Sequence, residues 1–558
     1  MYQQVTDPVS DSLGLSAIFA ALPILTLFVL LGGVKMRAHW AALISLAVAL
    51  FVAIVIYPMP IGQAFDSASE GAAFGLFPIM WIVVNAVWIY NLTVQTGDFA
   101  VLRRSFAKIS DDQRIQAIII AFSFGALMEA LAGFGTPVAI TSVMLIALGF
   151  QPLKAAALAL VANTAPVAFG AIATPIITLE SVSEIPKSEL GDMVGRQTPF
   201  LALIVPLILV AMVDGRRGIR QTWPAAVVGG VSFALGQFAC SNYISVELTD
   251  VIASLVSVGA LVLLLRVWQP AEPLHDIDEG AAGAGRPAIA GAESHNPALE
   301  ADIARRDREH DSGRDVLRAY APYLIIIAIF SVAQWSPVKD WLTDNTTKEF
   351  AWPGLDVTNA DGEELTSVTF KFDWLSSPGS LLLIAGALTM IALRMRVGAA
   401  LRTYLATLDQ LKWAILTVAT VLGLAYVMNQ SGQTITLGLW MAGAGGVFAF
   451  LSAILGWLGV AITGSDTSSN ALFGALQVTA AKDAGLDPTL MAAANSSGGV
   501  LGKMISPQNL AIAVAAVGLA GQEGTLFRKV LGWSLVLVLI MAVLVYLQST
   551  SLLSWMVP

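Results

Sequence analysis

Residues 464–470 read Gly464-Ser465-Asp466-Thr467-Ser468-Ser469-Asn470, a polar stretch between two long apolar ones. In a bilayer, polar groups at this depth have to face protein or a water-filled cavity, because lipid offers them no hydrogen bonds. A carboxylate there is costly and usually belongs to an ion or proton path. The stretch therefore predicts a binding cavity lined by Gly464, Ser465, Thr467 and Ser468. Asp466 is the best candidate for proton coupling, with Na⁺ coordination and a helix N-cap as the alternatives.

Composition places the whole chain in a membrane. Of the 558 residues, 56% are hydrophobic and only 12% are charged, against roughly 25% charged in soluble proteins. The mean hydropathy is +0.74. Cys240 is the single cysteine, which excludes an intramolecular disulfide and a Cys-based cluster. We therefore expect no metal and no redox cofactor, and the net charge of −9 gives no reason to expect a nucleic-acid partner.

Apolar runs predict an all-α polytopic membrane protein with about 12–14 transmembrane segments. Two further regions, 133–177 and 464–516, are apolar but interrupted by Gly, Pro, Ser, Thr and Asn, so we expect broken or re-entrant helices there. The uninterrupted spans are expected near residues 13–33, 38–57, 74–96, 115–132, 197–213, 222–240, 249–268, 319–336, 378–395, 411–430, 434–456 and 530–549.

Basic residues orient these spans, because short cytoplasmic loops are rich in Lys and Arg. No basic residue precedes Lys35, so a cleavable signal peptide is not expected. The loops with Asp66 and Glu70, with residues 180–192 and with residues 337–376 then lie outside, and the N-terminus is periplasmic. The basic residues assigned to the cytoplasm are Lys35, Arg37, Arg103, Arg104, Lys108, Arg114, Arg216, Arg217, Arg220, Arg394, Arg396 and Arg402.

The two halves of the chain resemble each other. Asn163 precedes Pro175 by twelve residues, and Asn495 precedes Pro507 by twelve. Since the charge pattern gives the halves opposite orientations, we predict an inverted-topology repeat, an architecture that places a binding site at mid-membrane. The predicted division is a first repeat at 1–213, connecting helices at 214–268, a cytoplasmic polar linker at 269–316 and a second repeat at 317–558.

The first interrupted region offers an anion site. Its stretch Gly133-Phe134-Gly135-Thr136-Pro137 allows close backbone approach, and Pro137 suits the first turn of a helix. Free N–H groups at a helix start favour a carboxylate, although small residues also serve helix packing. Glu129 precedes this stretch by four residues and is either a second proton-exchanging acid or a structural hydrogen-bonding group.

The second interrupted region offers a cation. Asn495-Ser496-Ser497-Gly498 is followed by Lys503, which could pair with a substrate carboxylate or with Asp466. A lysine near a helix end can instead extend to the membrane interface. Asn163 and Thr164 are expected to lie opposite as the pseudo-symmetric counterparts. With Lys503 the one clear cation among these stretches, a monocarboxylate fits better than a di- or tricarboxylate.

At these stretches the chain resembles the lactate permease family. The matching residues are Glu129 with 133–140, then 464–472 and 495–508. One departure is Ala130, where the resemblance leads us to expect a glycine. The resemblance implies a secondary transporter of the bacterial inner membrane that imports L-lactate, D-lactate or glycolate with H⁺. It also implies an elevator-like fold and a homodimer.

Two alternatives stay open from the residues themselves. A Na⁺-coupled carboxylate transporter would use the same polar stretches. A membrane enzyme would need a nucleophile–base pair, a phosphate loop or a metal cluster within the spans, and the sequence holds none of these patterns.

Overall fold

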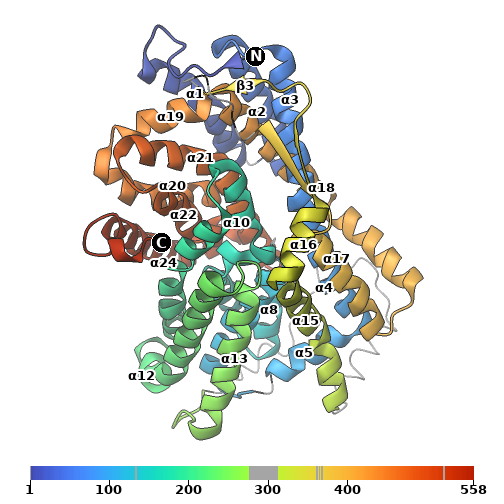
Figure 1. Ribbon diagram of the computed structural model, residues 1–558. Coiled ribbons are helices and arrows are strands. Elements are labelled where there is room, and N and C mark those ends of the chain that lie inside the picture. The colour runs from blue at the N-terminus through green and yellow to red at the C-terminus, as the bar shows by residue number, and fades with distance from the viewer. Residues whose placement is uncertain are drawn as a thin grey trace.

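The computed structural model describes residues 2–34, 36–107, 109–131, 133, 135–274, 312–359, 362, 365, 368–519 and 522–558. The described chain is overwhelmingly helical. Figure 1 shows α10 and α19–α22 in the middle of the molecule, between the N-terminal helices α1–α3 and the helices α12 and α13 at the opposite end. Most of the predicted linker, residues 275–311, lies outside the described residues, as do Lys35, Lys108 and Phe134.

Between residues 13 and 267 the chain has long apolar helices and, around residue 133, several short ones. Several α-helices continue into π-helical turns, namely η1 (Val29–Gly33), η2 (Val52–Ile56), η3 (Gly75–Met80) and η4 (Ala117–Phe124). The α-helices are α1 (Leu13–Phe28), α2 (Ala38–Phe51), α3 (Ile61–Phe74), α4 (Trp81–Thr96), α5 (Asp98–Ala107), α6 (Gln113–Gln116), α7 (Gly125–Leu131), α8 (Thr136–Ala147), α9 (Pro152–Ala162), α10 (Gly170–Ser183), α11 (Lys187–Val194), α12 (Thr198–Tyr243) and α13 (Thr249–Val267), with the 3₁₀ turn η5 (Val167–Phe169) before α10.

Residues 313–548 also form both long and short helices. Its α-helices are α15 (Gly313–Gln334), α16 (Ser336–Thr346), α17 (Pro378–Ala392), α18 (Val397–Ser431), α19 (Gln433–Ala442), α20 (Phe448–Thr463), α21 (Asp466–Ala484), α22 (Pro488–Gly499), α23 (Pro507–Ala516) and α24 (Glu523–Gln548). Short 3₁₀ turns are η8 (Gly445–Val447), η9 (Lys503–Ile505) and η10 (Ser554–Met556).

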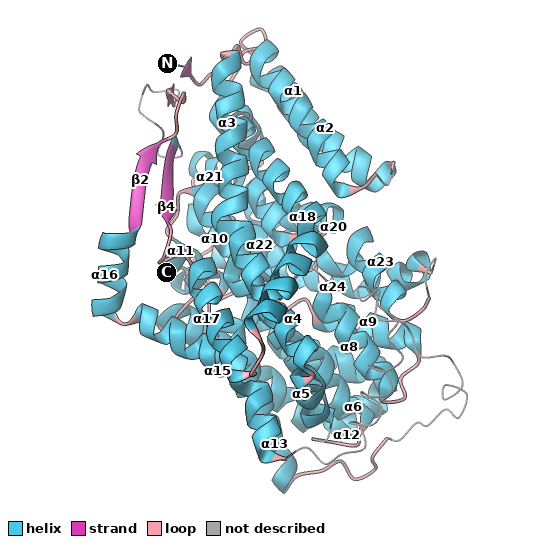
Figure 2. Cartoon of the chain, turned by 90° about the vertical axis from the view of Figure 1, so that its right-hand side faces the viewer, coloured by secondary structure: helices cyan, strands magenta, loops and turns pink. Residues whose placement is uncertain are grey.

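Four short strands lie at the edge of the helical body, where β2 and β4 run beside the helices next to α16 (Figure 2). Strand β2 (Thr347–Ala351) pairs antiparallel with β4 (Thr369–Asp373). Strand β1 (Tyr2–Gln3) pairs in parallel with β3 (Val357–Thr358). The segment 337–376, expected as a loop, therefore holds a helix and strands, and it binds the N-terminus of the chain.

Among the described residues, ten helical segments are long and apolar enough to cross a bilayer, or eleven if the bent pair Pro152–Ala162 and Val167–Ser183 counts as one span. The expected spans at 197–213 and 222–240 are the two arms of α12, which bends at Asp214 and Gly215. The backbone of Gly230 in the second arm lies against Ala202 in the first, so the arms form a hairpin.

Two predictions are wrong, one about the extent of a span and one about a loop. The expected span at 434–456 is split, because α19 ends at Ala442 and α20 starts at Phe448, with glycines 443, 445 and 446 between them. The expected outer loop with Asp66 and Glu70 is helix α3, which runs on through η3 into α4. Glu70 is buried there and accepts a 2.7 Å hydrogen bond from Gln430 on α18.

Small residues bring the helices of the centre into close contact, as is common between membrane helices. A Cβ atom on Gly456 of α20 would lie 2.0 Å from the carbonyl oxygen of Asn495 on α22. A Cβ on Gly498 would lie 2.1 Å from the carbonyl oxygen of Ala453. The backbones of α20 and α22 therefore touch, which fixes the second interrupted region against its neighbour.

Candidate functional site

Both interrupted regions are broken helices, as predicted. In the first, α9 and the segment Val167–Ser183 meet at an angle of 68° across residues 163–166. In the second, α22 ends at Gly499, and η9 separates it from α23. Pro137, Pro488 and Pro507 each lie in the first turn of a helix, where the missing N–H leaves no bond unmade. The breaks leave backbone polar groups in the interior of the protein.

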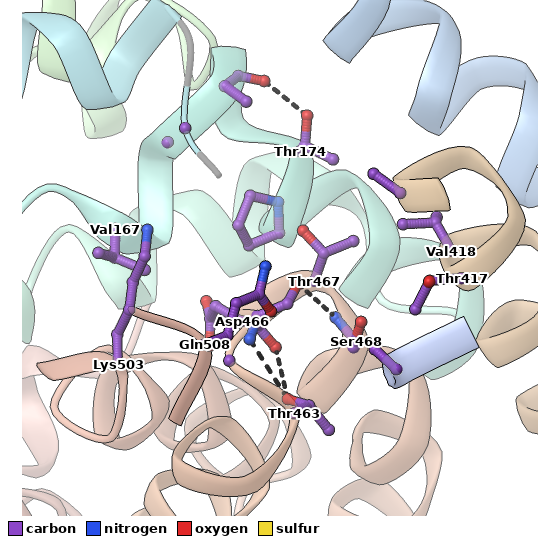
Figure 3. Close-up of a pocket in the computed structure, with 18 of the residues that line it drawn as sticks. Val167, Thr174, Thr417, Val418, Thr463, Asp466, Thr467, Ser468, Lys503 and Gln508 are labelled. Carbon is purple, nitrogen blue, oxygen red and sulfur yellow. Dashed lines mark hydrogen bonds between the residues drawn. The ribbon is translucent and has the colours of Figure 1, made fainter. Parts of the chain in front are cut away.

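A cavity of about 220 Å³ lies where the two broken regions meet α2 and α18. This is about seven times the roughly 30 Å³ that a water molecule occupies in the liquid, so the space admits a small organic anion. Figure 3 shows Asp466 and Gln508 near its centre, with Lys503 and Val167 on one side and Thr417 and Val418 on the other. The wall mixes apolar side chains with hydroxyls, one lysine and two carboxylic acids, among the residues that the structure describes.

A buried ion pair forms one part of this wall. Lys503 Nζ lies 2.6 Å from Glu129 Oε1, and the two side chains are 8% and 3% exposed. Asn163 Nδ2 donates to the other carboxylate oxygen of Glu129 at 3.1 Å. The sequence left open whether Lys503 pairs with Asp466 or extends to the interface; in the structure its partner is Glu129. The pair joins η9 of the second broken region to α7, directly before the first.

Asp466 is the second buried acid of the cavity. Its Oδ2 accepts a 2.5 Å hydrogen bond from Ser496 Oγ and a 3.5 Å one from Asn470 Nδ2. Its Oδ1 is buried and has no partner among the described atoms. The N-cap of α21 is Ser465, whose hydroxyl accepts from the Ser468 N–H at 3.3 Å. Asp466 is therefore not the cap, and its carboxyl group is available for a ligand or a proton.

Two glycines make room for these acids. A Cβ on Gly170 would lie 2.8 Å from Glu129 Oε1, and a Cβ on Gly499 would lie 2.4 Å from Asp466 Oδ1. Directly after Gly170, residues 171–173 have φ angles of 44° to 57°. L-residues in this region cost about 1–2 kcal/mol each. Such strain is typical of functional sites, and here it turns the chain so that Ala171 and Thr174 line the cavity.

The cavity wall includes about half of the residues singled out in the sequence. Lining residues among them are Glu129, Gly133, Gly464, Ser465, Asp466, Thr467, Ser468 and Lys503. Asn163 and Ser496 lie behind the wall and hydrogen-bond Glu129 and Asp466. The remaining ones do not line the cavity: Gly135, Thr136, Pro137, Thr164, Asn495, Ser497 and Gly498. Phe134 is outside the described residues.

Residues outside the wall have identifiable contacts. Gly135 has φ 81° at the start of α8, and a Cβ there would lie 2.5 Å from Ile512 on α23. Thr164 donates to the carbonyl of Val161. Asn495 bridges Asn470 and Gln477, at 2.8 and 3.2 Å. The contacts of Gly135 and Asn495 join neighbouring helices, which is a positioning function, and the bond of Thr164 stays within the end of its own helix.

Sequence reasoning missed the part of the wall that comes from α2 and α18. The ring of His39 stacks on that of Trp413, with centroids 4.4 Å apart and planes at 20°, and both residues line the cavity with Thr417. His39 follows the basic residues of the first loop, and nothing in its sequence position indicates that it lines a cavity. Among the described residues, no group of His, Cys, Asp and Glu side chains is arranged to hold a metal ion.

We expect Gly499→Ala to disturb the site through Asp466. The added methyl would overlap Asp466 Oδ1 and lie 2.8 Å from Val460 Cγ2, and overpacking of this kind costs about 1–3 kcal/mol. Displacement of the carboxyl group is expected to lower substrate uptake at least about tenfold. Uptake of labelled substrate by reconstituted protein measures the effect.

Gly446→Ala is the matched control, because a Cβ on this exposed glycine meets nothing within 4 Å. It should leave uptake within about twofold of wild type, since surface substitutions of this kind change stability by less than roughly 0.5 kcal/mol. Equal uptake by the two variants would show that the contact between Gly499 and Asp466 does not affect transport.

Broken helices, a polar cavity with a buried ion pair and about ten apolar helices define a multi-pass membrane protein of the kind that includes secondary transporters. The comparison with known proteins specifies the class. The family model described as L-lactate permease matches residues 16–552. The chain belongs to the L-lactate permease family.

Relatives in this family cover the chain from end to end. The L-lactate permease of Bacillus subtilis is 43% identical over 576 residues, with all of both chains covered. The glycolate permease GlcA of Escherichia coli is 43% identical over 548 residues, with 96% of each chain covered. The solved structure of Neisseria gonorrhoeae MtrF aligns with a TM-score of 0.47 and 14% identity, covering 96% of this chain and 97% of that one.

Proposed function

We propose that this protein imports L-lactate, and also D-lactate and glycolate, by proton symport across the bacterial inner membrane. The observation that carries the proposal is the buried Lys503–Glu129 pair in the wall of the cavity. The names of the relatives, L-lactate permease and glycolate permease, support the substrate class. All three molecules are small 2-hydroxy monocarboxylates.

The ion pair suggests how a proton and an anion are coupled. In the empty site the lysine and the glutamate neutralise each other. When Glu129 takes up a proton, Lys503 loses its charged partner and can bind the carboxylate of the substrate instead. The loaded site, with neutral Glu129, Lys503 and one monocarboxylate, then has the same net charge as the empty site. Since an unpaired charge in a membrane interior is costly, the two ligands bind together more readily than either alone.

Hydroxyl groups complete the proposed binding site. Ser465, Thr467 and Ser468 line the cavity in the first turn of α21, where free N–H groups and hydroxyls can hold a carboxylate or the 2-hydroxyl group. Lys503 is the one lysine or arginine among the described lining residues, which favours a single carboxylate. Asn163 and Ser496 keep the two acids in place, and the other residues of both broken regions support them.

An elevator-like fold of two inverted repeats is part of the proposal, with the division 1–213, 214–268, 269–316 and 317–558. One observation supports this fold: each broken region has a glycine with positive φ shortly before a helix, Gly133 three residues before α8 and Gly464 two residues before α21. The pairing of β1 with β3 joins the N-terminus to the 337–376 segment, which fits a common, periplasmic side for both. We further propose a homodimer, as the family resemblance implies.

Na⁺ coupling is the second candidate, favoured by one observation. Asp466 Oδ1 is buried without a partner, and hydroxyl and carboxylate oxygens are the ligands that hard cations such as Na⁺ prefer. In that case Asp466 would hold the ion, and Glu129 would stay paired with Lys503 throughout transport.

Uptake of labelled L-lactate into proteoliposomes decides between the two ions when an inward pH gradient and an inward Na⁺ gradient are imposed separately. We expect accumulation with the pH gradient, indifferent to Na⁺, and a loss of at least about tenfold in Glu129→Gln, because the amide keeps the volume but cannot take up the coupling proton. Accumulation with the Na⁺ gradient alone would replace the proton by Na⁺. Failure of both gradients would overturn lactate as the substrate.

A further inference from the structure

A third acid lies inside the protein, apart from the cavity wall. Asp250 is fully buried in the first turn of α13. Its Oδ1 accepts a 2.9 Å hydrogen bond from Gln237 Nε2 on α12, while its Oδ2 is buried without any partner among the described atoms. Gln237 also contacts the carbonyl of Ala165 at 3.4 Å, and Ala165 belongs to the break between α9 and α10. Asp250 is thus linked to the first broken helix.

The titratable groups around Asp250 are acids or neutral. Helix α13 packs against α12, α7 and η4. Helix α12 contributes the thiol of Cys240, α7 contributes Glu129, which acts on Asp250 electrostatically, and η4 contributes no titratable side chain. Glu247, one helical turn before Asp250, is already paired with Lys187. No described cation is therefore left to neutralise a charge on Asp250.

A carboxyl group in this environment is most stable in its protonated, neutral form, because an unpaired buried charge is far more costly than a neutral group. The start of α13 offers some stabilisation to the ionised form, but a charge would still leave Oδ2 without a hydrogen bond. Such a group can hold a proton and release it when a better acceptor comes close. This is the behaviour required of an intramembrane relay.

Asp250 has two other acids near it, Glu247 before it in the chain and Glu129 on the neighbouring helix α7. Glu247 with Lys187 is at the end of the segment 244–248, on the side that the charge pattern assigns to the outside, and Glu129 with Lys503 is at the cavity. Asp250 connects the two, since it follows Glu247 by three residues and its helix α13 packs against α7, which carries Glu129. Its partner Gln237 also contacts Ala165 in the break whose Asn163 bonds Glu129. A proton that enters from the outer side therefore meets Asp250 before it meets Glu129.

We infer that Asp250 is a proton-binding relay that delivers the coupling proton from the outer side to Glu129. The inference rests on the proposed proton symport and goes beyond it by naming the route. When the substrate carboxylate draws Lys503 away from Glu129, Glu129 is left without a cation and becomes the better proton acceptor. Asp250 then gives the proton on its carboxyl group to the Glu129 carboxylate. Glu129 becomes neutral, Lys503 stays with the substrate, and Asp250 becomes a carboxylate that is held by Gln237 and the start of α13. A proton from outer water then restores it.

Asp250→Asn tests the relay, because asparagine keeps the size and the bond to Gln237 but cannot carry the proton. Two assays on the same proteoliposomes are compared. Exchange of internal unlabelled lactate for external labelled lactate needs no net proton movement, whereas accumulation driven by a pH gradient does. We expect exchange within about threefold of wild type and a loss of gradient-driven accumulation of at least about 30-fold. Ser257→Ala is the control, since it removes a buried polar group of the same helix that bonds Ser123.

Each outcome is decisive. Equal loss of exchange and accumulation, with Asp250→Glu failing to restore either, would assign Asp250 a structural role and overturn the relay. Unchanged accumulation in Asp250→Asn would overturn it as well. If the wild-type protein shows exchange but no pH-driven accumulation, proton symport itself is wrong. The wild-type assay alone gives this result, so it is distinguished from a failure of the relay.

Discussion

Lys503→Gln is expected to abolish uptake of L-lactate while leaving the carboxylate of Glu129 buried and unpaired. Removing one partner of a buried ion pair costs about 3–5 kcal/mol, and each 1.4 kcal/mol corresponds to a factor of ten. The variant also lacks the one lysine or arginine among the described residues of the cavity wall. Initial uptake rates in proteoliposomes should therefore fall at least about 100-fold, and the yield of folded protein should fall with them.

The double variant Lys503→Gln with Glu129→Gln separates the two effects. It removes both charges and leaves two amides that can hydrogen-bond each other, so stability in detergent should return to within about 1 kcal/mol of wild type. Uptake should stay lost, because neither the proton acceptor nor the cation for the substrate is present. Lys529→Gln, an exposed lysine of α24, is the control and should transport normally. A double variant that regains uptake would show that the ion pair serves folding alone.

Much of the site could be predicted because polar residues are conspicuous in an apolar chain. Asp466, Glu129 and Lys503 interrupt stretches that otherwise suit a lipid environment. Because burying such groups in a membrane is costly, their presence indicates a functional site. The breaks at 163–166 and 499–506 could be predicted for a similar reason, since Gly, Pro and Asn at that depth do not continue a helix well.

Which charges meet could not be predicted, because pairing depends on contacts between elements far apart in the chain. Lys503 and Glu129 are 374 positions apart, and Asp466, much nearer to Lys503 in the sequence, has Ser496 as its hydrogen-bond partner instead. Asp250 escaped notice because it stands at the end of its apolar run, where an acid ordinarily indicates a helix start facing water. Asp250 is nevertheless buried, and Gln237 of α12 contacts it there.

Helix α3 was missed for a related reason. Asp66 and Glu70 give this stretch the polarity of a loop, yet α18 covers its inner face so closely that a Cβ on Gly71 would lie 2.4 Å from the carbonyl of Leu422. The bond from Gln430 then satisfies Glu70. Hydropathy measures preference for lipid, and it does not detect a helix whose polar side chains find partners within the protein.

Arg114→Met is expected to destabilise the protein by about 3–5 kcal/mol, the usual cost of breaking a buried ionic network. Arg114 was predicted as one of several cytoplasmic loop charges, but it is fully buried. It bonds both carboxylate oxygens of Asp112 at 3.1 and 2.7 Å, Asp214 at 3.0 Å, and the carbonyl of Glu272 at 2.7 Å. It thereby joins the start of α6 to the bend of α12 and to the beginning of the 269–316 linker.

Arg217→Met provides the matched comparison, because Arg217 also contacts Glu272, at 2.8 Å, but both side chains are more than half exposed. Exposed pairs contribute about 0–1 kcal/mol, so this variant should unfold in detergent almost as wild type does.

Burial by itself raises the pKa of Asp112, but the hydrogen bonds and charge of Arg114 and the N–H of Leu274 outweigh it, so the pKa lies below its ordinary value. The ionised Asp112 therefore stabilises the fold fully above its unfolded pKa of roughly 3.9, and this contribution disappears only as the pH falls below that value. The difference between the two variants should accordingly be the same at pH 8 and pH 5; a difference that vanishes in this range would mean that Arg114 stabilises the protein through a group other than Asp112.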